Sequence, residues 1–93
     1  MDEKTEKRLL EKLSDLEHQQ WAHWTDYLFR KLSLNLNELK VDNKTKEDFK
    51  RWAKQIITPY KDLPEKEKEA DRVWARKVIN LIKSEDNLNF FQA

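Results

Sequence analysis

The sequence contains no glycine and no cysteine. Without glycine the chain cannot form the loops in which the backbone closely approaches a phosphate, so a P-loop and a dinucleotide-binding fingerprint are excluded. Without cysteine it has no disulfide, no thiolate ligand for zinc and no cysteine nucleophile. The absence of cysteine also agrees with a reducing compartment, and we expect a cytoplasmic protein.

A strong excess of one charge and a long apolar run are also missing. Lys and Arg number 19 and Asp and Glu 18, which gives a formal net charge of +1 over 93 residues. Such a balance creates no global field that would attract nucleic acid or an anionic membrane. No apolar run approaches the roughly 20 residues that cross a bilayer. The charged residues at the start, 1–4, do not resemble a secretion signal, so we expect neither a membrane span nor export.

The apolar content is concentrated in large side chains, with four Trp, four Phe and two Tyr. A chain of this length forms one domain and buries only about 60–65% of its unfolded surface. We therefore expect a single domain over residues 1–93, with 1–12 and 84–93 as extensions of it. Some of the aromatic residues are then available for a subunit interface or a pocket.

The spacing of apolar residues predicts a long first helix over residues 5–32. At about 100° per residue, five side chains fall on one narrow stripe: Leu9, Leu13, Leu16, Trp24 and Tyr27. We expect Trp24, inside this stripe, to lie in the core. A capping-box pattern at residues 14–17 leaves open a second helix start, although we favour one continuous helix.

Two further helices are marked by caps and prolines. The pattern fails over 33–44, and residues 45–48 resemble the start of a short helix that ends before Pro59. Its apolar face is predicted to hold Phe49, Trp52, Ala53 and Ile56. Pro64 suits the first turn of a third helix running to Lys83. Its predicted inward residues are Ala70, Val73, Trp74, Val78, Leu81 and Ile82.

The predicted fold class is therefore all-α. It is a small three-helix domain with a long N-terminal helix, a short middle helix, a Pro-Tyr loop and a C-terminal helix. The apolar end of the chain, residues 89–93, is expected to dock on this domain.

No catalytic or metal-binding constellation is visible. His18 and His23 are the only imidazoles, and five positions apart on a helix they point to different sides, so they cannot chelate one metal ion. No serine has a visible base, and the paired carboxylates are typical of solvated helix surfaces. We expect no enzyme, no metal and no cofactor.

Two groups of residues are candidates for ligand binding. Trp21 lies at the edge of the apolar stripe near His18, where an indole and an imidazole can form the wall of a pocket for a planar ligand. Alternatively, Trp21 closes the rim of the core. Arg72 and Arg76 lie one turn apart and can hold a phosphate or carboxylate. Alternatively, they form exposed ion pairs with the surrounding glutamates.

Two segments together resemble the ryanodine-receptor repeat domain, in the small stand-alone versions found in bacteria and phages. Residues 16–21, LEHQQW, resemble that family's His-x-x-Trp helix. Residues 58–72, TPYKDLPEKEKEADR, resemble its Pro-Tyr-x-x-Leu loop leading into an acidic, lysine-rich helix. The similarity covers residues 13–82. The family's glycine-aromatic turn after the tryptophan helix is replaced here by a continuing helix at 24–28, as in a divergent phage-type member.

The resemblance implies a non-enzymatic module that binds a nucleotide-derived messenger, such as an ADP-ribose derivative or a cyclic nucleotide. In a phage it would be a sponge that sequesters a host defence signal in the host cytoplasm. The residues carried over as ligand-binding are His18, Trp21, Pro59, Tyr60, Lys61, Arg72 and Arg76. On this hypothesis Trp21 and Tyr60 stack on the base or ribose, while the cationic residues hold phosphates.

The alternative function is a helical protein–protein interaction or structural module with no small-molecule ligand. Under both hypotheses we expect a homodimer or higher homo-oligomer, because symmetric dimers are the commonest assemblies. Neither hypothesis includes a nucleic acid or a membrane as partner.

Overall fold

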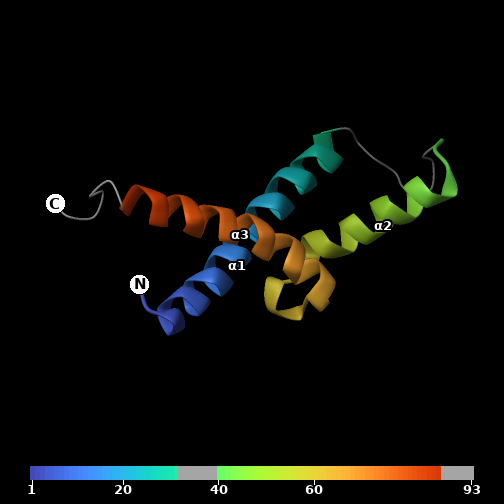
Figure 1. Cartoon of the computed structure of the whole chain (residues 1–93). Coiled ribbons are helices and arrows are strands. Elements are labelled where there is room, and N and C mark those ends of the chain that lie inside the picture. Colours follow the sequence, from blue (N-terminus) through green and yellow to red (C-terminus); the bar gives the residue numbers. More distant parts are fainter. Residues whose placement is uncertain (32–39, 87–93) are drawn as a thin grey trace.

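The computed structural model describes residues 1–31 and 40–86 (Figure 1). It contains the helices α1 (Glu3–Lys31), α2 (Asn43–Ile57) and α3 (Glu65–Asp86), with a short 3-10 helix, η1 (Tyr60–Asp62), between α2 and α3. No strand occurs in the two described ranges. The predicted all-α, three-helix fold is confirmed, and α1 is continuous through residues 14–17. The predicted docking of residues 89–93 lies outside the described residues.

Helices α1 and α2 both begin at an aspartate. The carboxylate of Asp2 accepts a hydrogen bond from the backbone N–H of Thr5 at 2.7 Å, and Asp42 accepts one from Thr45, also at 2.7 Å. Each bond satisfies a backbone donor that the helix itself leaves unpaired. The prediction that the second helix starts at Thr45 is therefore wrong, because Asp42 is its cap.

Helix α3 begins at Glu65, one residue after the proline predicted to lie in its first turn, and extends past Lys83 to Asp86. The predicted break at Ser84 is wrong. The apolar pattern ends there because the next residues are polar. An exposed helix can continue without apolar residues, because its backbone hydrogen bonds form within the helix. The ammonium of Lys83 also lies 2.6 Å from the carboxylate of Glu6, which joins this end of α3 to α1.

Helix α1 is the central element, since it packs against α2, η1 and α3. Figure 1 shows α3 crossing α1. Few of the described residues are buried: Ser14, His18, Tyr60, Leu63, Ala75 and Ile79. Ser14 and Ala75 have no exposed surface at all. Small side chains on both helices let α1 and α3 approach closely, which places the core at this crossing.

The apolar stripe predicted as the core side of α1 is largely exposed. Trp24 is 57% exposed, and Leu16 and Tyr27 are also exposed, so the prediction that Trp24 lies in the core is wrong. The buried side of α1 instead carries Ser14 and His18, roughly on the opposite side of the helix at about 100° per residue. That face is selected because it combines a small side chain with an imidazole whose polar atom finds a partner.

The inward face of α3 also differs from the prediction. Ala75 and Ile79 are buried, and of the six predicted residues only Val78 and Ile82 are partly buried. The other four are exposed: Ala70, Val73, Trp74 and Leu81. The face of α3 toward α1 also includes Arg72, which pairs with acidic residues, so apolar periodicity alone points to the neighbouring face.

The molecule is elongated. Its extents are 55 × 24 × 19 Å and its radius of gyration is 17.2 Å, whereas a close-packed domain of this length has a radius of about 12 Å. None of the helices in the described ranges combines the length and the apolar character that a bilayer crossing requires. Helical surface that would be covered in a closer-packed bundle is therefore open to solvent.

The close crossing of α1 and α3 predicts that Ala75→Leu destabilises the protein. The larger side chain has no space at a position with no exposed surface, so the free energy of unfolding should fall by about 1–3 kcal/mol. Urea unfolding followed by circular dichroism measures this. Asn80→Leu, at an exposed position of the same helix, is the matched control and should change stability by less than about 0.5 kcal/mol. Equal effects of the two variants would contradict the crossing.

Candidate functional site: a groove lined by three tryptophans

The segment between α2 and α3 is attached to α1 by His18. Its Nε2 lies 2.6 Å from the backbone carbonyl oxygen of Thr58. A carbonyl oxygen only accepts, so Nε2 carries the proton and donates it. The other ring nitrogen, Nδ1, lies 3.9 Å from a carboxylate oxygen of Asp71 on α3. Buried His18 therefore positions the end of α2 and faces α3.

Tyr60 provides the second attachment. Its hydroxyl donates to the carboxylate of Glu11 on α1 at 2.6 Å. Burial and the hydrogen bond to Glu11 raise the pKa of Tyr60. The same bond lowers the pKa of Glu11 against the effect of burial, with help from Arg72. The Tyr60 hydroxyl thus attaches the segment before α3 to α1.

Arg72 lies among carboxylates. Its Nε is 2.9 Å from Glu11, and its Nη1 is 2.8 Å from Glu65 and 3.5 Å from Glu69. The hydrogen bonds that Arg72 donates to Glu65 and Glu11 raise the pKa of Arg72, and its side chain is 17% exposed. These contacts occupy the guanidinium, so Arg72 ties α1 to the first turns of α3.

Arg76 continues this network. Its Nη1 donates to Glu69 at 2.6 Å, and this bond lowers the pKa of Glu69. The hydrogen bond from Arg72 likewise lowers the pKa of Glu65. Arg72 and Arg76 therefore both form ion pairs with neighbouring glutamates, which is the alternative that the sequence left open.

A groove of about 360 Å³ lies where the three helices meet. Each helix contributes one indole to its wall: Trp21 from α1, Trp52 from α2 and Trp74 from α3. Leu63 also lines it and is buried. The volume falls within the range of pockets that bind small molecules, about 300–1,000 Å³. We call this feature the tryptophan groove.

Two rings of the tryptophan groove make close contacts with other side chains of the protein. His18 and Trp21 are stacked, with centroids 6.0 Å apart and planes inclined by 23°. The ammonium of Lys77 lies 4.0 Å from the centroid of Trp74. Such a contact is a cation–π interaction, in which the ring face attracts positive charge. The groove thus offers flat aromatic surfaces, one of which already holds a cation.

The charged groups that line the tryptophan groove are acidic. They are Glu17, Glu67 and Asp71, and neither Lys nor Arg is among its lining residues. Burial raises the pKa of Asp71, and this rise is opposed by His18. A ligand that enters therefore meets aromatic faces and a negative potential.

The seven residues predicted to bind a ligand lie in different places. His18 and Trp21 line the tryptophan groove, whereas Pro59 and His18 line a separate open hollow beside the end of α2. Tyr60 is buried against Glu11, and Lys61 is exposed. The structure brings His18 and Trp21 together but places none of the three predicted cations in the groove.

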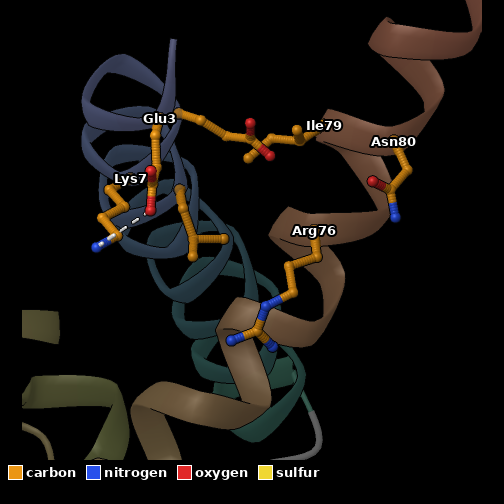
Figure 2. A pocket seen from close by; sticks show the side chains of 7 residues that line it. Glu3, Lys7, Arg76, Ile79 and Asn80 are labelled. Carbon is orange, nitrogen blue, oxygen red and sulfur yellow. Dashed lines mark ion pairs between the residues drawn. The ribbon is translucent and has the colours of Figure 1, made fainter. Parts of the chain in front are cut away.

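Arg76 borders a third hollow, of about 310 Å³, between the N-terminal half of α1 and the C-terminal half of α3. Figure 2 shows Glu3 and Lys7 on the α1 side and Arg76 on the α3 side. Two glutamates, Glu3 and Glu6, and two cations, Lys7 and Arg76, line it, and Lys7 is paired with Glu3 at 3.9 Å. This hollow is a charge-balanced gap between two diverging helices.

Sequence reasoning missed two walls of the groove. Trp52 and Trp74 were predicted as inward-facing core residues of their helices, although Trp74 is 59% exposed. The available signal was that each predicted helix carries at least one tryptophan, which three crossing helices can bring together. The sequence did not indicate the role of Glu11, because its pattern does not distinguish this glutamate from the other acidic residues of the same helix.

Searches against protein-family models, curated proteins and solved structures found no match to this chain. Within residues 1–31 and 40–86, no group of three or more His, Asp or Glu side chains is placed to hold a metal ion.

The bond between Tyr60 and Glu11 predicts that Tyr60→Phe lowers the free energy of unfolding by about 1 kcal/mol, the usual net value of such a bond. Tyr27→Phe removes the same hydroxyl from an exposed ring and should change stability by less than about 0.5 kcal/mol. Urea unfolding of both variants makes the comparison. A loss from Tyr27→Phe as large as that from Tyr60→Phe would contradict the assigned role of Tyr60.

The lowered pKa values of Glu11, Glu65 and Glu69 predict acid sensitivity. These carboxyls stay ionised in the folded state at pH values where the unfolded chain takes up protons. Their contribution is therefore complete above their ordinary pKa of 4.5 and is lost as the pH falls through their lower folded values. Stability measured from pH 7 to pH 3 should decrease below about 4.5. The difference between wild type and Glu11→Gln should shrink over the same interval, and a constant difference would contradict the linkage.

Proposed function

We propose that this protein is a non-catalytic binding protein whose tryptophan groove takes a planar aromatic group such as a nucleobase. The observation that carries the proposal is the meeting of three indoles, one from each helix, around one groove of suitable volume. Bases stack on aromatic side chains with about 1–3 kcal/mol per base, because every base has a π-face. Trp21, Trp52 and Trp74 are the residues assigned to this contact.

The charge of the groove restricts the ligand. Glu17, Glu67 and Asp71 disfavour a phosphate inside it, so the group that enters is an uncharged or cationic base. In a nucleotide-derived ligand the phosphates would then point away from the groove. Lys77, held on the ring of Trp74, is the cation we assign to that outer part of the ligand. This assignment replaces Lys61, Arg72 and Arg76 in the phosphate-binding role.

Binding without conversion is supported by the state of His18. Its Nε2 proton is used on the carbonyl of Thr58, and its ring is buried, so this nitrogen has no proton to exchange with a ligand. A binder that does not convert its ligand acts by sequestering it. Together with the resemblance to ryanodine-receptor repeat domains, this supports a cytoplasmic sponge that lowers the free concentration of a nucleotide-derived signal, such as a host defence messenger.

A ligand panel tests the proposal. Adenosine, AMP, ADP-ribose and the positively charged 7-methylguanosine are each added at up to about 1 mM, and melting temperature and tryptophan fluorescence are recorded. Binding to the native state raises the melting temperature by mass action. We expect 7-methylguanosine to bind more tightly than adenosine, because carboxylates line the groove, and AMP to bind more tightly than adenosine, because Lys77 meets the phosphate outside the groove.

Two tryptophan variants locate the site. Trp74→Ala should weaken binding about tenfold or more, as expected for the loss of one stacking surface. Trp24→Ala is the matched control, because Trp24 is equally exposed but does not line the groove. The proposal is wrong if no ligand in the panel changes the melting temperature or the fluorescence. It is also wrong if both variants weaken binding equally.

The second candidate function is a helical protein–protein interaction module. It is favoured by the apolar residues that α1 exposes, among them Leu16, Trp24 and Tyr27. The elongated shape of the chain supports a homodimer as the interaction. A homodimer is compatible with ligand binding, because these exposed residues do not line the tryptophan groove.

A further inference from the structure

Helix α1 carries an apolar stripe on the side that does not form the core. The residues of this α1 stripe are Leu9, Leu13, Leu16, Trp24 and Tyr27. Leu16, Trp24 and Tyr27 are at least half exposed, while Leu9 and Leu13 are partly exposed. Trp24 and Tyr27 pack edge to face on each other, with centroids 6.0 Å apart. Part of the stripe is therefore an ordered aromatic surface facing solvent.

Four of the five residues of the α1 stripe are placed symmetrically about Gln20, the exception being Leu9. Leu16 and Trp24 lie four residues to either side of Gln20, and Leu13 and Tyr27 lie seven residues to either side. When two copies of α1 run antiparallel with Gln20 on a two-fold axis, Leu16 of each copy faces Trp24 of the other. Leu13 likewise faces Tyr27. A surface that matches itself under a two-fold rotation is what an isologous dimer requires.

We propose that the α1 stripe is a dimer interface, occupied by the α1 stripe of a second copy of this chain in antiparallel orientation. This proposal does not depend on the ligand assigned to the tryptophan groove.

The length of α1 supports a second copy as the occupant. A standard interface removes about 800 Å² from each partner. At about 1.5 Å per residue, the 29 residues of α1 form a helix long enough to provide such a contact with a second α1.

The helix dipole of α1 favours the antiparallel direction. Its first turn contains Glu3 and Glu6, and its last turn contains Arg30 and Lys31. In the antiparallel register about Gln20, Arg30 and Lys31 of one copy lie opposite Leu10 and Leu9 of the other, so the preference for this direction comes from the opposed helix dipoles. A parallel pair would bring like-charged ends together.

Analytical ultracentrifugation of wild type and variants tests the interface. We expect wild type to sediment as a dimer at about 50 μM, and Leu16→Glu and Trp24→Glu to sediment as monomers with unchanged helical circular dichroism. The matched control is Ile57→Glu, which places the same charge on an apolar residue that is 81% exposed outside the α1 stripe and should remain a dimer. A monomeric wild type, or a dimer that survives both stripe variants, would overturn the proposal.

Disulfide trapping tests the orientation without relying on charged variants. The chain has no cysteine, so single introduced thiols react only with each other. A mixture of Leu16→Cys and Trp24→Cys proteins should form mixed disulfide dimers, because a disulfide needs Cα atoms about 4.4–6.8 Å apart. Each variant alone should cross-link much less, since its two thiols lie far apart along antiparallel helices. Self-linking of each variant without mixed dimers would show parallel pairing and overturn the proposal.

Discussion

The attachment of residues 58–63 to the polar side of α1 is the constraint on which the rest of the structure depends. His18 holds the carbonyl of Thr58, and Glu11 holds the hydroxyl of Tyr60, at 2.6 Å in both cases. Each bond joins residues at least 40 positions apart in sequence. Together they fix where α2 ends and where α3 begins. Because a buried polar group without its partner is costly, the same two bonds also decide which side of α1 is buried.

This constraint produces both surfaces to which we assign a function. Because residues 58–63 are attached to the polar side of α1, Trp21 lies where the helices meet. Trp52 and Trp74 complete the groove there. This attachment also leaves the apolar side of the same helix uncovered. On our assignment, one side of α1 carries a wall of the binding groove and another side carries the dimer stripe. This assignment accounts for the large apolar side chains that stay exposed although only six residues are buried within 1–31 and 40–86.

The sequence was sufficient to predict the helices but not their buried faces. Apolar periodicity and prolines located α1, α2 and α3 to within a few residues, because these signals are local. Burial was predicted poorly for Trp24 and Trp74, since periodicity cannot distinguish a core face from a groove or an interface face. Trp21 and His18 were correctly placed together, because both lie on one helix. The pairing of Arg72 with Glu11 spans 61 positions, and no local pattern encodes it.

We assign three of the four tryptophans to one binding groove. The most direct measurement is a titration of ¹⁵N-labelled protein with 7-methylguanosine, followed through the four indole N–H signals in NMR spectra. The account predicts that the signals of Trp21, Trp52 and Trp74 shift together along one saturating curve while that of Trp24 stays unchanged. A shift confined to Trp24, or saturation of the three groove signals at different ligand concentrations, would contradict it.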